Sequence, residues 1–71
     1  MNNYSASRIG RLLGQIDRNY TSIDGYRQML TIAQTRNMEY EQGRIPKMIA
    51  ELERDIEDVM DELVQLGYVP A

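Results

Sequence analysis

Two arginines near the N-terminus, Arg8 and Arg11, are the side chains whose type and spacing best suit a ligand. A guanidinium offers a planar fork of N–H donors that matches phosphate and carboxylate oxygens. The start of a helix would add backbone N–H donors and the positive end of the helix dipole, and Tyr4 could stack on a ring. These residues predict contact with an anion. The alternatives are that the arginines pair with acidic residues of a neighbouring subunit or simply face water.

Catalytic and metal-binding chemistry find little support in the composition. The 71-residue chain has no cysteine and no histidine, which removes thiolate ligands, disulfides and the commonest general base. Di-metal helical bundles combine inward glutamates with histidine ligands. The acidic residues of the second half therefore predict a solvated face, made of Glu51, Glu53, Asp55, Glu57, Asp58, Asp61 and Glu62. We expect no enzyme activity, no metal and no cofactor.

Charge is distributed unevenly along the chain, whose net charge is −3. Up to Ala50 there are seven basic and four acidic residues, and from Glu51 onward there are one basic and seven acidic residues. In an antiparallel pair of helices the two halves would lie side by side and neutralise each other. The alternative is two separate outer surfaces, one basic and one acidic. The negative net charge, with arginines spread around a helix, argues against nucleic acid as a ligand.

The segment from Ile45 to Leu66 carries the strongest structural signal. Its apolar residues alternate at spacings of four and three, which places them on one face of a helix. They are Ile45, Ile49, Leu52, Ile56, Val59, Leu63 and Leu66. Gly67 suits the position just after the end of this helix.

A second heptad stripe predicts a long first helix over about residues 5–41, with Ser5 as its N-cap and Ser7 as the other candidate. Its a and d positions keep one register throughout, and only Asn19 and Asn37 among them are polar. An asparagine in such a seam fixes register and oligomeric state. The segment at residues 21–25 interrupts the helical composition, but the heptad phase is kept across it. The pattern therefore favours one continuous helix, with room for a kink there.

Gly43 and Pro46 predict the turn between the helices, at residues 42–45. Glycine suits the left-handed position after a helix, and proline suits the first turn of the next one. The second helix is then expected over about residues 46–66, with a short tail at residues 67–71. A turn this short makes the two helices antiparallel.

The longer first helix is expected to project beyond the second, leaving Ile9, Leu12 and Leu13 uncovered. Such an apolar arm needs another subunit, a partner, or a fold-back at residues 21–25. Gly10 and Gly14 lie four residues apart and would let another helix backbone approach the arm; the alternative is a loosely formed helix start. A chain of this size also has a marginal core, which favours self-association.

Together these features predict an all-α fold, an antiparallel helical hairpin that forms one small domain over residues 1–71 and assembles into an oligomeric, coiled-coil-like bundle. The predicted function is that of a non-catalytic, homo-oligomeric binding or inhibitor module whose arm engages a macromolecular partner, most simply a protein. No apolar run approaches the length of a membrane span, and the N-terminus lacks the features of a signal peptide. We therefore expect a cytoplasmic protein.

In general plan the predicted assembly resembles the small helical oligomers that phages use to sequester host signalling nucleotides. The resemblance is one of architecture and rests on no sequence motif. It implies an alternative function, a sponge that holds an anionic small molecule such as a cyclic nucleotide between subunits, near Tyr4, Arg8 and Arg11. A phage-encoded chain would act in the host cytoplasm.

Overall fold

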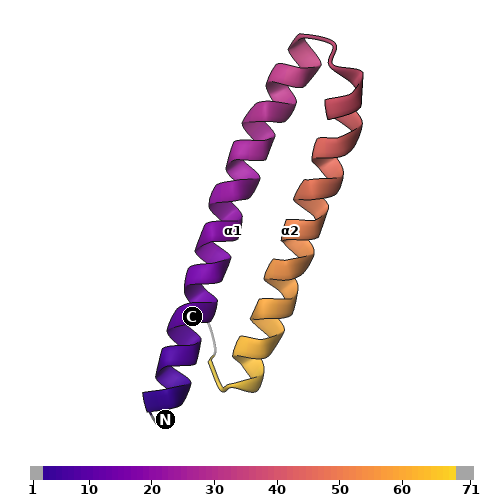
Figure 1. Cartoon of the computed structure of the whole chain (residues 1–71). Helices are drawn as coiled ribbons and strands as arrows, with labels where there is room; N and C mark the ends of the chain where they lie inside the picture. Colours follow the sequence, from indigo (N-terminus) through magenta and orange to yellow (C-terminus); the bar gives the residue numbers. More distant parts are fainter. Residues whose placement is uncertain (1–2, 69–71) are drawn as a thin grey trace.

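The chain folds into two α-helices that run antiparallel and pack side by side (Figure 1). The computed structural model describes residues 3–68 of the 71-residue chain, and side chains from Ala6 to Tyr68. Helix α1 spans Asn3–Thr35 and helix α2 spans Glu39–Gln65, and the described residues form no strand. The predicted all-α hairpin is confirmed, whereas its assembly into an oligomer stays a prediction.

The turn between the helices lies earlier in the chain than predicted. Asn37 has a φ of 55°, in the left-handed region. The amide of Met38 donates to the carbonyl of Ala33 (2.8 Å) and the amide of Asn37 donates to that of Gln34 (3.4 Å), the two bonds of a Schellman motif. Asparagine adopts this backbone conformation more readily than most residues. The predictions of a turn at residues 42–45 and of Asn37 in the helical seam are therefore both wrong.

Gly43 and Pro46 lie inside α2 rather than before it. Pro46 has no N–H to donate to the carbonyl of Gln42, but it lies on the exposed side of the helix, where water can satisfy that carbonyl. The earlier turn brings Ile45 into the core beside Ala33, and each of these two residues is 1% exposed. The gain from burying this isoleucine favours the extended helix.

Helix α1 is continuous through residues 21–25, as the unbroken heptad register across this segment predicted. The hydroxyl of Thr21 donates to the carbonyl of Asp17 (3.1 Å), so that its polar group is satisfied within the helix. The helix begins at Asn3 rather than at Ser5, and it ends at Thr35 because the left-handed turn follows directly.

The two helices cover each other along nearly their whole length. One buried cluster lies toward the turn and consists of Ile23, Ala33, Ile45, Ile49 and Ile56; the other lies toward the termini and consists of Ile9, Leu12, Val59 and Leu63. Ile9 and Leu12 are only 7% and 8% exposed. The prediction of an uncovered arm is therefore wrong for these two residues, because the earlier turn lengthens α2 until it reaches them.

Helix α2 ends at the predicted glycine. Gly67 has a φ of 86°, and the amide of Tyr68 donates to the carbonyl of Leu63 (2.9 Å). This is a second Schellman-type ending, and it directs Tyr68 back against the cluster at the termini.

The molecule is a single layer of two helices and is correspondingly elongated. Its radius of gyration is 15.8 Å, against about 11 Å for a compact domain of this length. Its accessible surface is 5404 Å², against about 4600 Å² for a compact monomer of the same mass. Two broad sides of the hairpin are therefore open to partners.

Replacing Gly43 by alanine should stabilise the protein. Gly43 lies in the exposed interior of α2, and a Cβ added there meets nothing within 4 Å. We expect Gly43→Ala to raise the free energy of unfolding by about 1 kcal/mol in urea denaturation, because alanine has the higher helix propensity. Asn37→Ala should lower it by about 1 kcal/mol, because Asn37 is left-handed. A destabilised Gly43→Ala variant would place the turn at Gly43 and contradict this fold.

Candidate functional site

The residues predicted to form the binding arm do not lie together on one surface. Ile9 and Leu12 are buried against α2, and the guanidinium of Arg8 is paired with Glu62. Of the predicted set, Arg11 and Leu13 are exposed, and they lie on different sides of α1. The side chain of Tyr4 lies outside the described residues. The structure therefore does not bring the described residues of the predicted set together, and anion binding by the arm stays a prediction.

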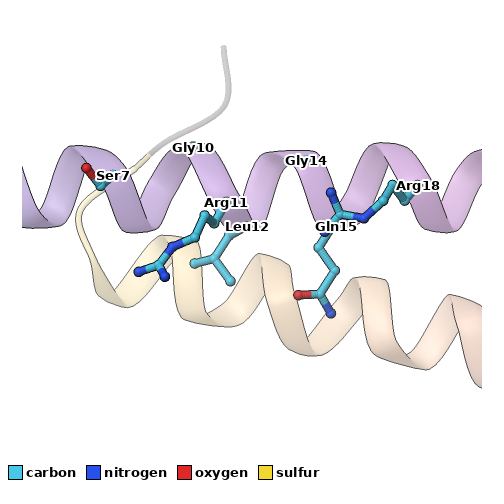
Figure 2. Close-up of a pocket in the computed structure, with 7 residues that line it drawn as sticks. All are labelled: Ser7, Gly10, Arg11, Leu12, Gly14, Gln15 and Arg18. Carbon is cyan, nitrogen blue, oxygen red and sulfur yellow. The ribbon is translucent and has the colours of Figure 1, made fainter.

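Arg11 lines an open groove of about 920 Å³ along α1. Figure 2 shows Arg11 and Gln15 extending toward α2, with Gly10 directly before Arg11 and Gly14 directly before Gln15 on α1. Arg18 lies back over Gly14, and its Nη1 atom would come within 3.3 Å of an added Cβ. The two glycines thus leave room along the surface of α1. The guanidinium of Arg18, from the same helix, occupies part of that room.

Asn19 lies in the seam between the helices, as its heptad position predicted. It is half-buried, and its amide Nδ2 lies 3.5 Å from the carbonyl oxygen of Leu52 in α2. This long contact links the two helices of one hairpin. A role for Asn19 in oligomer packing stays a prediction.

The basic and acidic halves of the chain neutralise each other less than the sequence predicted. Among the described residues, Arg8–Glu62 is the one ion pair that joins the helices. The pair between Arg44 and Glu41 (2.7 Å) lies within α2, where its hydrogen bond and the charge of Glu41 raise the pKa of Arg44 above its ordinary value. Most of the charge on both helices therefore faces outward.

One broad side of the hairpin exposes large apolar side chains, and we name it the apolar face. It consists of Leu13 and Tyr20 of α1 and Met60 and Val64 of α2. Tyr20 and Met60 line a shared groove of about 190 Å³ between the helices. Leu13 is seven residues from Tyr20 and Val64 is four from Met60, so each lies on the same side of its helix as the groove. Tyr20 is 52% exposed and Val64 is 61% exposed.

Acidic residues surround the apolar face. Asp17 and Asp24 each follow an apolar-face residue of α1 by four positions, and Glu53 and Glu57 line the same groove as Tyr20. All four carboxylates are exposed. Arg27 is the one base that heptad spacing places on this side of α1 within the described residues. The apolar face therefore combines hydrophobic contact area with negative charge.

The sequence identified part of this face. Leu13 belongs to the predicted site, but Tyr20, Met60 and Val64 do not. The available signal was their position beside the heptad stripe, where a two-helix bundle leaves side chains half-covered. Unless the pairing of the helices is known, a position beside the stripe can belong either to the edge of the core or to an outer surface.

The opposite side carries a second apolar groove close to the turn. Its volume is about 310 Å³, and it is lined by Met29, Ile32, Ala33, Met38, Glu41 and Ile45. Met29, Ile32 and Met38 are largely exposed. Glu41 is the one charged residue among those that line this groove.

The described part of the chain shows neither a cluster of metal-binding residues nor a membrane-spanning helix. Within residues 3–68, no group of three or more histidine, cysteine, aspartate or glutamate residues is placed to hold a metal ion. Neither α1 nor α2 has a stretch long and apolar enough to cross a membrane. Comparison of the chain with protein-family models, with curated proteins and with solved structures found no match.

Proposed function

We propose that this chain is a non-catalytic binding module that engages a protein partner through its apolar face. The observation that supports the proposal is the continuous exposure of Leu13, Tyr20, Met60 and Val64 on one side of the hairpin. Contiguous apolar side chains with a polar rim mark interaction surfaces in monomeric proteins. An aromatic residue beside flexible methionine provides the anchors that such surfaces use.

The charge around the face indicates what kind of partner fits it. Asp17, Asp24, Glu53 and Glu57 would attract a basic segment and repel an acidic one. A long, shallow apolar strip suits an amphipathic helix laid along it. The proposed partner is therefore a protein that presents a helix with an apolar stripe flanked by lysine or arginine.

Self-association belongs to the same proposal. A single layer of two helices has a small core, and small domains commonly gain stability by oligomerisation. Inhibition as the mode of action and a cytoplasmic location stay predictions.

The proposal is tested by reconstitution with a purified partner. Proteins captured by the wild-type chain are identified, purified and titrated by calorimetry. We expect the double variant Tyr20→Ala, Val64→Asp to raise the Kd at least about 30-fold, since anchor residues of an interface each contribute about 2 kcal/mol or more. Both positions are about half exposed or more, so the variant should keep its helical circular dichroism.

The matched control is Ile32→Asp, on the opposite side of the hairpin and 50% exposed. It should leave the Kd unchanged. If the purified partner binds the Tyr20→Ala, Val64→Asp variant as tightly as the wild type, the apolar face is not the binding surface.

A second candidate function is capture of an anionic small molecule. It is favoured by Arg11 and Arg18, which line one open groove together with Gly10 and Gly14. Cyclic nucleotides would then raise the melting temperature of the wild type but not of the Arg11→Ala, Arg18→Ala variant. No shift with any nucleotide would remove this candidate.

A further inference from the structure

The side of the hairpin opposite the apolar face separates positive from negative charge, and we name it the charged face. The ion pair Arg8–Glu62 bridges the two helices on this side. By heptad spacing, further charged residues of each helix lie on the same side as this ion pair. The charged face carries Arg8, Arg11, Arg18 and Arg36 at the α1 edge and Glu41, Glu51, Asp55, Asp58 and Glu62 on α2.

On this face α1 carries only basic residues, and α2 carries more acidic than basic residues. The acidic residues of α1, Asp17 and Asp24, lie beside the apolar face instead. On α2, Arg44 shares this side and is paired with Glu41, while Lys47 and Arg54 lie three or four residues from Glu51 and Asp58, at the outer margin of the acidic strip. The charged face is therefore a basic strip next to an acidic strip, with only Arg8–Glu62 pairing them among the described residues.

We infer that the charged face binds the charged face of a second copy of this chain. A two-fold axis parallel to the helices would place α1 of each copy on α2 of the other, with basic strips on acidic strips. Every neighbouring helix pair in the resulting four-helix bundle would be antiparallel. The inference deepens the self-association included in the proposed function by naming its surface and its symmetry.

The levels of the charges along the hairpin agree with this arrangement. A two-fold axis parallel to the helices places each residue at the same height along the bundle, which we call its level, as its equivalent in the second copy. Arg11 lies next to Leu12, which packs in one cluster with Leu63, so it would reach the level of Glu62 in the second copy. Arg18 lies between Ile16 and Ile23, at the level of Val59 and Ile56, where the second copy presents Asp55 and Asp58.

The apolar groove near the turn fits the same arrangement. Met29 and Ile32 line it from α1, and Ile45 and Glu41 line it from α2. The parallel axis brings the two turns to the same end, so that the exposed Met29 and Ile32 of one copy meet the groove of the other. Methionine side chains adapt well to such contacts. The interface would then have an apolar end and a charged remainder.

Other arrangements are disfavoured by charge. An axis perpendicular to the helices would stack α1 on α1 and bring the basic strip of one copy onto the basic strip of the other. Pairing through the apolar face would oppose its carboxylates, Glu53 and Glu57 among them. Like charges placed together in an interface are strongly unfavourable.

The area available is sufficient for a specific dimer. The hairpin measures 52 × 20 × 15 Å, so its broad side covers about 1000 Å². Stable interfaces bury about 800 Å² on each partner.

The test is sedimentation equilibrium of the full chain at several salt concentrations. We expect a dimer of twice 8.3 kDa. Its Kd should rise at least about tenfold as salt increases from about 0.1 M to about 1 M, because the Debye length falls from about 10 Å to about 3 Å. Arg11→Glu with Arg18→Glu should raise the Kd at least about 100-fold, while circular dichroism reports retained helices.

A rescue variant tests the symmetry. Combining Arg18→Glu alone with Asp55→Arg and Asp58→Arg, while Arg11 keeps Glu62 as its partner, exchanges the signs of the charges at that level and should restore dimerisation to within about tenfold of the wild type. With a perpendicular axis the same variant would still oppose like charges and stay monomeric. Tyr20→Ala with Val64→Asp, on the apolar face, should leave the dimer unchanged.

Three results would overturn the inference. They are a monomer at every concentration and salt, a dimer that the arginine reversals leave intact, and a dimer that only the apolar-face variant dissociates. Each is distinguishable from failure of the proposed function, because partner binding is measured separately with variants of the apolar face.

Discussion

Leu12→Ala is expected to destabilise the protein by about 2–3 kcal/mol, a large share of the stability of so small a domain. Leu12 is 8% exposed and packs in one cluster with Ile9, Val59 and Leu63. Alanine would remove three carbon atoms and leave a cavity that two rigid helices close only in part. Urea denaturation monitored by circular dichroism measures the loss.

The neighbouring leucine provides the control for this prediction. Leu13 lies on the apolar face and is 38% exposed, so Leu13→Ala should cost clearly less, about 1 kcal/mol or below. Equal and small effects of both substitutions would mean that the N-terminal part of α1 projects beyond α2. That outcome would restore the uncovered arm that the sequence alone predicts.

Ile45→Ala should have an effect of similar or larger size, about 2–4 kcal/mol. Ile45 and Ala33 are each 1% exposed and belong to the cluster nearest the turn. The burial of Ile45 depends on the part of α2 that precedes Pro46, which exists only because the turn is formed by Asn37. Thermal and urea unfolding of Ile45→Ala therefore report on this segment directly.

Tyr40 is the matched comparison for Ile45. Both lie on heptad stripes in the sequence, but Tyr40 is 77% exposed. Tyr40→Ala should change the free energy of unfolding by less than about 0.5 kcal/mol. A loss of several kcal/mol at Tyr40 would show that the first helix continues past Thr35, against the structure.

The helices and their antiparallel pairing could be predicted from the sequence because they depend on periodicity. The stripe from Ile45 to Leu66 holds all the buried residues of α2, and the unbroken phase across residues 21–25 correctly indicated a continuous α1. Gly67 ends α2 as expected, since glycine alone among the nearby residues adopts a left-handed backbone at no steric cost.

The turn could not be placed from the sequence because two sites compete for it. Gly43 and Pro46 match the preferences of a helix end and a helix start, whereas Asn37 is an acceptable but weaker left-handed residue. The packing of the two helices against each other decides between these two sites. Only the turn at Asn37 buries Ile45 on Ala33 and covers Ile9 and Leu12 with α2.

Because the turn was predicted too late in the chain, the sequence also pointed to the wrong residues as exposed apolar surface. An overhanging arm made Ile9 and Leu12 appear available to a partner, although both belong to the core. The exposed apolar residues instead come from both helices, and Tyr20 meets Met60 only once the register is known. A surface formed by residues of two helices depends on how those helices pair. The heptad pattern of one helix does not specify that pairing.

The most direct test of the binding function is a methyl NMR titration of the labelled chain. The probe is a helical peptide whose leucine stripe is flanked by lysines, and the control peptide carries glutamates in their place. We predict that the lysine peptide shifts the methyl signals of Leu13, Met60 and Val64 and leaves those of Met29 and Ile32 in place, while the glutamate peptide shifts none. Shifts confined to Met29 and Ile32, equal shifts with both peptides, or no shifts at all would contradict a protein-binding role for the apolar face.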